Sequence, residues 1–145
     1  NGNPVGYLDQ FGHAACKYSI SGRTLKCSGK TGSFSSDRFV SGLGAFANDP
    51  GNVDIPYLGP IPTGIYEIRE KFYRDGSSFP RRALLPRAGT NTFDRFSFQL
   101  HGCRNPQNCS EGCPAATSNA TLNNLMDFLD LEEVLGEENT LAVEK

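Results

Sequence analysis

Two cysteines on either side of a short turn constrain the fold of this chain more than any other local feature. Cys16 and Cys27 flank Ser21 and Gly22 at equal distances, so a symmetric hairpin about that turn sets the two cysteines opposite each other. Residues opposite each other on paired strands lie close enough for a disulfide. The spacing therefore predicts a hairpin over residues 15–28 closed by a Cys16–Cys27 disulfide, which is typical of an oxidising compartment.

Glycine and proline break the rest of the chain into short segments. The 145 residues include 16 Gly and 9 Pro, while 10 Phe and 5 Tyr argue for a folded core. Strand-like segments cover residues 65–73, 82–86 and 95–101. Ser118 can cap a helix that runs to about residue 131, because its apolar positions repeat at helical spacing. The sequence therefore predicts a mainly β domain with one C-terminal helix.

The charge of the chain excludes some classes of function. A net charge of −2 gives no reason to expect a nucleic-acid partner, and no run approaches the ~20 apolar residues of a membrane span. The chain begins without Met and shows no signal peptide, which indicates a processed or trimmed product. Six acids and one base lie from Asp130 onward. We interpret residues 1–145 as a single, monomeric domain in which about 132–145 form a solvated acidic tail.

The segment 96–101 separates apolar from polar side chains. Strand period puts three apolar side chains on one face and three polar ones on the other: Phe96, Phe98 and Leu100 against Ser97, Gln99 and His101. His101 is thus predicted to leave the strand end on the polar side. Cys113 follows twelve positions later, and a loop closed by a predicted Cys103–Cys109 disulfide would bring it back toward His101.

A cysteine beside a histidine can act as a nucleophile. The imidazole of His101 can take the proton of the Cys113 thiol, and the resulting imidazolium stabilises the thiolate. Gly112 lets the backbone turn tightly beside Cys113, and the N–H groups of these two residues could face an oxyanion. The other histidine, His13, lies in a loosely patterned segment and is interpreted as incidental.

Other interpretations of the same residues stay open. His101 can be an ordinary strand-end residue and Cys113 a core thiol, since cysteine is among the most buried residue types. A zinc site is a second alternative, although the spacing lacks paired C-x2-C knuckles; its ligands would be His101, Cys103, Cys109 and Cys113. A papain-like peptidase is a third, but it usually places its Cys before its His in the chain.

Two motifs, in order, resemble one family. His101 followed by Ser-Glu-Gly-Cys at residues 110–113 resembles the H-x8-S-x-G-C signature of the type VI secretion L,D-transpeptidase effectors. Gly-Pro-Ile-Pro-Thr-Gly-Ile-Tyr at residues 59–66 is similar to the G-P-I-P-x-G-x-Y segment that precedes a strand in that family. The resemblance covers roughly residues 17–116.

The resemblance implies a mainly β, L,D-transpeptidase-like β-sandwich or open barrel with a C-terminal helix. It implies Cys113 as nucleophile and His101 as base, with Ser110 and Gly112 shaping the turn, and neither cofactor nor metal. The implied substrate is the peptidoglycan tetrapeptide stem, whose terminal D-Ala is removed or exchanged for another D-amino acid. Such effectors are secreted, delivered to the periplasm of a target bacterium and blocked by a cognate immunity protein.

Substrate-binding residues are also expected near the pair. Ser97 and Gln99 share the polar face with His101 and are candidates for lining the cleft. Arg82, with Arg81 and Arg87, is a candidate for holding a stem carboxylate, because Arg pairs bidentately with carboxylates.

The chain also departs from the larger L,D-transpeptidase family. That family usually has His after the Ser and a basic or polar residue after the Cys, where this chain has Glu111 and Pro114. The departure puts the oxyanion hole and the cross-linking reaction in question. The alternative of another class is a disulfide-stapled, non-catalytic domain that binds cell wall or a partner.

Overall fold

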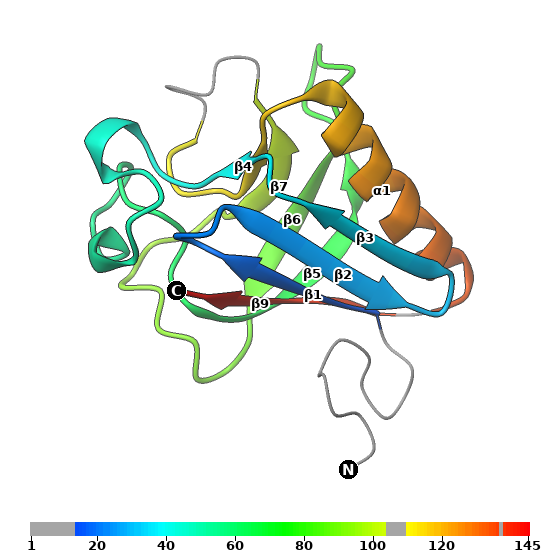
Figure 1. The fold of residues 1–145 in the computed structure, drawn as a ribbon, viewed down its shortest axis with the longest axis horizontal. Coiled ribbons are helices and arrows are strands. Elements are labelled where there is room, and N and C mark those ends of the chain that lie inside the picture. The colour runs from blue at the N-terminus through cyan, green and yellow to red at the C-terminus, as the bar shows by residue number, and fades with distance from the viewer. Residues whose placement is uncertain (1–13, 104–109, 137) are drawn as a thin grey trace.

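The computed structural model describes residues 14–103, 110–136 and 138–145. In this part of the chain, nine strands form one strongly curved, nearly closed sheet with a long helix beside it (Figure 1). The strand order is β3-β2-β1-β9-β5-β6-β7-β8-β4. The bounds are β1 Ala14–Ser19, β2 Thr24–Gly29, β3 Gly32–Ser36, β4 Phe39–Val40, β5 Gly64–Phe72, β6 Arg81–Pro86, β7 Gln99–Gly102, β8 Ala115–Ala116, α1 Asn119–Val134 and β9 Asn139–Glu144, with 3-10 turns η1 Gly44–Phe46 and η2 Pro50–Asn52.

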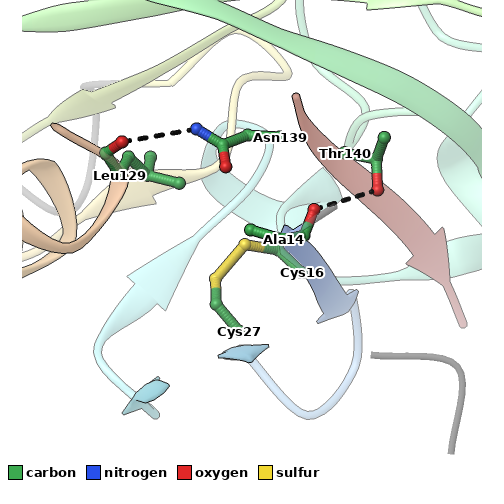
Figure 2. Close-up of a disulfide and its surroundings, with 6 residues drawn as sticks. All are labelled: Ala14, Cys16, Cys27, Leu129, Asn139 and Thr140. Carbon is green, nitrogen blue, oxygen red and sulfur yellow. Dashed lines mark hydrogen bonds between the residues drawn. A yellow bond between two sulfur atoms is a disulfide. The ribbon is translucent and has the colours of Figure 1, made fainter. Parts of the chain in front are cut away.

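The predicted hairpin and its disulfide are confirmed. Strands β1 and β2 pair antiparallel with Cys16 opposite Cys27, and their sulfur atoms are bonded (Figure 2). Both cysteines are buried in the core, because alternate residues of each strand face inward. The symmetric turn thus sets the register, and the register places the disulfide.

The prediction that about 132–145 form a solvated acidic tail is wrong. Residues 139–144 form β9, which lies in the middle of the sheet, parallel to β1 and antiparallel to β5. Its alternation buries Leu141 and Val143. At its start, Asn139 Nδ2 donates to the carbonyl of Leu129, and Thr140 Oγ1 donates to that of Ala14 (Figure 2). The sequence analysis missed this strand, because its short alternation of apolar residues lies in a segment rich in acidic residues.

Helix α1 begins as predicted and runs three residues further. Ser118 accepts a hydrogen bond from the Thr121 N–H, which caps the helix. One face is buried, including Leu125 and Leu129, and packs against the sheet. Glu132 belongs to this buried face: its carboxylate accepts bonds from the backbone N–H groups of Lys30 and Thr31 at the β2–β3 turn. It is a structural acid rather than part of a solvated tail.

The predicted strand over residues 95–101 is shorter than expected. Only Gln99–Gly102 pair in the sheet, as β7. Ser97 has a positive φ of 65°, which turns the chain and breaks the strand alternation before Phe98. Phe98 and Leu100 are buried as predicted, but Phe96 is 79% exposed, so the prediction that it shares their face is wrong.

Within the described residues, α1 is the long helix, and it is neither long nor apolar enough to cross a bilayer. His13 and Cys109 lie outside the described residues, so the interpretation of His13 and the Cys103–Cys109 pairing stay predictions. Cys103 itself is disulfide-bonded.

Candidate active site

His101 and Cys113 line one cleft of about 710 Å³. His101 lies on β7, and β7 pairs parallel with β8 so that His101 is opposite Ala115, two residues after Cys113. The neighbouring strand β8 therefore carries the Cys113 loop back to β7. The cleft is lined by Pro56, Tyr57, Arg74, Arg81, Phe93, Asp94, Arg95, Phe96, Ser97, Phe98, His101, Glu111 and Cys113.

Cys113 is a free, partly buried thiol. Its Sγ accepts a hydrogen bond from the backbone N–H of Gln99 at 3.3 Å and lies 3.9 Å from the Ser97 carbonyl, to which it can donate. Burial raises the pKa of the Cys113 thiol above its ordinary value, while the Gln99 N–H and the charges of Arg81, Arg74 and Arg95 oppose that rise. The resting thiol is therefore protonated at neutral pH.

His101 is held in one orientation by the backbone. Its Nδ1 lies 2.7 Å from the carbonyl oxygen of Gly102, which can only accept, so Nδ1 carries the proton. This leaves Nε2 as a proton acceptor. Burial lowers the pKa of His101 to about 4, only partly opposed by the bond to Gly102, and the charges of Arg81 and Arg74 lower it further. Sequence could not show whether an aspartate or a carbonyl orients this ring; here it is a carbonyl.

Ser110 holds the cysteine loop together. Its Oγ accepts bonds from the N–H groups of Gly42 and Gly112, at 3.1 Å and 3.2 Å, and donates to the Cys113 carbonyl. The expected turn-shaping role of Ser110 thus has a specific geometry. The Gly112 N–H is directed to Ser110, so it is not free to act as the oxyanion donor expected from sequence.

Ser41 is a residue that the sequence did not single out. It is fully buried, and its Oγ donates to the Gly112 carbonyl at 2.8 Å while accepting from the Ile61 N–H at 2.9 Å. Ser41 thereby connects the Gly-Pro-Ile-Pro segment to the cysteine loop. No local pattern marks this serine, because both of its partners are distant in sequence.

Arg95 also connects the Gly-Pro-Ile-Pro segment to the cysteine loop, through its charged guanidinium. Its guanidinium donates to four carbonyl oxygens, those of Val53, Gly59, Pro60 and Glu111, at 2.6–3.2 Å. It also lies over the Phe98 ring, 5.3 Å from the centroid. Arg95 thus binds carbonyl oxygens of both sequence motifs, and it also lines the cleft.

The predicted substrate-binding residues separate into two groups. Ser97 lines the cleft, and Gln99 reaches it through its backbone N–H and a side-chain bond to Arg81. Arg82 does not reach the cleft, because its side chain is fully buried and its guanidinium pairs with Asp130 and Glu133 of α1. The prediction that Arg82 binds substrate is therefore wrong.

Strained backbone gathers around the cleft. Among the described residues, six non-glycine residues have positive φ, and four of them line it: Tyr57, Phe93, Asp94 and Ser97. Such conformations cost on the order of 1–3 kcal/mol each and persist where the surroundings enforce them, which is common at functional sites.

The zinc alternative finds no support in the described part of the chain. No three His, Cys, Asp or Glu side chains lie close enough there to hold a metal ion. Cys103, one of the four ligands considered, is disulfide-bonded and cannot coordinate as a thiolate.

Solved structures share this fold. The helical cell shape determining protein Pgp2 from Campylobacter jejuni superposes with a TM-score of 0.60 at 19% identity, over 92% of this chain and 48% of that one. An L,D-transpeptidase from Mycobacterium smegmatis gives 0.51 at 12% identity, over 92% and 59%. Another from Stackebrandtia nassauensis gives 0.51 at 14% identity, over 100% and 62%. No curated protein matches the chain in sequence.

The fold of this chain thus resembles the L,D-transpeptidase fold, as the two motifs predicted. This chain spans about half the length of the Pgp2 structure. A model of the Tlde1 domain matches residues 38–143, so the chain belongs to the Tlde1 domain family, the type VI secretion L,D-transpeptidase effectors.

Proposed function

We propose that this protein is a cysteine-dependent L,D-carboxypeptidase that removes the terminal D-Ala from peptidoglycan tetrapeptide stems, or exchanges it for another D-amino acid. The observation that carries the proposal is the shared cleft, which is lined both by His101, with an unprotonated Nε2, and by the free thiol of Cys113. The cleft volume is that of a ligand site rather than of a packing defect.

The pair starts neutral. Because the pKa of His101 is lowered to about 4 and that of Cys113 is raised, neither group is charged at pH 7. Attack and proton transfer therefore accompany each other, with His101 as general base. This arrangement differs from a preformed thiolate–imidazolium pair and predicts a thiol that is slow to react without substrate.

The first half-reaction forms a thioester. Cys113 Sγ bonds to the carbonyl carbon of the diaminopimelate L-centre, and its proton passes to His101 Nε2. The carbonyl oxygen becomes an oxyanion, which the Cys113 N–H can stabilise. Collapse breaks the C–N bond, and the imidazolium returns the proton to the departing D-Ala amine. The lowered pKa of His101 makes this imidazolium a strong acid for that step.

The second half-reaction releases the enzyme. Water, or the amine of a D-amino acid, loses a proton to His101 as it attacks the thioester carbonyl. The C–S bond breaks, and the sulfur takes the proton back. Water gives a tripeptide stem, whereas an amine gives an exchanged tetrapeptide.

The biological setting is part of the same proposal. As a secreted effector, the protein would reach the periplasm of a target bacterium, act there as a monomer and be blocked by a cognate immunity protein. Peptidoglycan is the substrate that this compartment supplies, and the Cys16–Cys27 disulfide suits its oxidising conditions.

Digestion of purified sacculi tests the chemistry. Wild-type protein should convert tetrapeptide to tripeptide muropeptides, read by mass, and an excess of a second D-amino acid should reveal exchange. Cys113→Ala should abolish both reactions, and Cys113→Ser should retain the fold with little activity. Sacculus binding without turnover would instead favour the non-catalytic alternative, and turnover that survives Cys113→Ala would overturn the assignment of the nucleophile.

A further inference from the structure

Two arginines lie at the cleft beside the reacting pair. Arg74 follows β5 and Arg81 begins β6, so the β5–β6 turn carries both to the cleft that holds Cys113 and His101. Arg81 Nη1 donates to the Gln99 side-chain carbonyl at 2.8 Å, which orients the guanidinium. A guanidinium has five N–H donors, and this bond uses one of them.

Among the residues that the structure describes, no carboxylate forms an ion pair with Arg74 or Arg81. Asp94 and Glu111 also line the cleft but pair with neither arginine. Arg82, one residue further along β6, faces the opposite side and is bound by two carboxylates of α1. Within the described part of the chain, β6 thus carries one arginine with carboxylate partners, Arg82, and one without, Arg81.

The two charges act on the reacting groups. Both Arg81 and Arg74 lower the pKa of Cys113 and of His101, although burial is the larger influence on each. An anion bound by these arginines would therefore lie close to the sulfur. In a tetrapeptide stem, the terminal carboxylate is one residue beyond the scissile carbonyl, and a residue spans at most ~3.6 Å.

We propose that Arg81, assisted by Arg74, binds the terminal carboxylate of the stem peptide and so restricts cleavage to the last residue. The inference rests on the proposed function and names the group of the substrate that its site recognises. Arg suits this task because its planar fork pairs bidentately with a carboxylate. A stem extended beyond the fourth residue, or capped there, has no carboxylate at this position.

Three synthetic disaccharide tetrapeptides test the assignment. One carries free carboxylates, one has the terminal D-Ala amidated, and one has the diaminopimelate side-chain carboxyl amidated. The variants are Arg81→Met and Arg81→Lys, with Arg69→Met as control, since Arg69 lies on β5 outside the cleft and pairs with Glu67. A midpoint of thermal unfolding equal to that of wild-type protein establishes that a variant is folded.

The terminal amide should be a poor substrate for wild-type protein, by about 10- to 100-fold in kcat/KM. Arg81→Met should lower kcat/KM by a similar factor on the free acid and by little on the terminal amide. The preference for the free acid over the terminal amide should therefore disappear. Arg81→Lys should recover part of it, and Arg69→Met should match wild type.

Binding to Cys113→Ala protein, measured by calorimetry, gives the same comparison without turnover. Preference for the free acid over the terminal amide in that background, lost on adding Arg81→Met, supports the inference even if the chemistry differs from that proposed. Equal losses on acid and terminal amide, or discrimination that collapses only for the diaminopimelate amide, would overturn it. Absence of D-Ala release by wild-type protein, with the binding preference intact, would overturn the proposed function alone.

Discussion

The guanidinium of Arg95 occupies the space that a side chain on Gly112 would need. A Cβ at residue 112 would collide with Arg95 Nη2, and Gly112 also has a φ of +132° that side chains rarely adopt. The glycine of the Ser-x-Gly-Cys motif is therefore required by the arginine that anchors the loop, as well as by the turn itself. This contact joins the nucleophile loop to the Gly-Pro-Ile-Pro segment, through the carbonyls of Gly59 and Pro60.

Gly112→Ala should disrupt this contact and lower both stability and activity. The positive φ and the collision together should cost about 3 kcal/mol in the free energy of unfolding, measured by urea denaturation. Gly32→Ala is the matched control, because Gly32 has a similar φ of +142° with open space around it and carries only the backbone cost. Equal losses in the two variants would contradict a role for the contact.

Arg95→Met should leave four carbonyl oxygens without their donor and cost on the order of 3 kcal/mol. Arg95→Lys keeps the charge but not the fork, so it should recover only part of the stability. The Arg95 charge also lowers the pKa of Cys113, so alkylation of that thiol should shift to higher pH in Arg95→Met and less in Arg95→Lys. A purely structural arginine would leave the alkylation profile unchanged in folded protein.

Iodoacetamide should react with Cys113 of wild-type protein only slowly at pH 7. Because burial raises the pKa of this thiol above its ordinary value, the rate should increase with pH and reach half its maximum in alkaline solution. Mass spectrometry of the alkylated peptide measures the rate at each pH. A midpoint below neutral pH would show a preformed thiolate and contradict the neutral resting pair.

Acid should destabilise the protein through His101. Its pKa falls from 6.5 in the unfolded chain to about 4 in the fold, so between these values the unfolded state binds one more proton. The free energy of unfolding should therefore decrease as the pH falls through this window, by on the order of 3 kcal/mol at this residue. His101→Gln should remove that part of the pH dependence, and parallel curves for the two proteins would refute it.

Replacing both Cys16 and Cys27 by Ala should cost about 3 kcal/mol, because the disulfide closes a short loop with a sequence separation of 11. Folded protein should still release D-Ala, since the disulfide is not among the residues that line the cleft. Reduction of wild-type protein should cost at least as much stability, because it also breaks the disulfide of Cys103. Loss of activity at temperatures where the variant stays folded would contradict a purely stabilising role.

Several parts of this protein could be predicted from the sequence because their causes are local. The hairpin turn sets Cys16 opposite Cys27, Ser118 caps α1, and strand period buries Leu100. The two motifs likewise predicted that His101 and Cys113 share one site, and both residues line the same cleft. Each of these depends on residues near one another in the chain, or on a pattern that the chain itself displays.

Other parts were decided only by the tertiary structure. Acidic composition predicted a solvated tail, yet β9 inserts between β1 and β5, because the strand supplies backbone hydrogen bonds to two distant partners. Arg81 and Arg82 are identical neighbours in the sequence. Only the carboxylates of α1 show that Arg82 forms structural ion pairs, while Arg81 lies at the cleft. Sequence specifies local geometry and residue chemistry, whereas burial and partners depend on which distant segments the fold brings together.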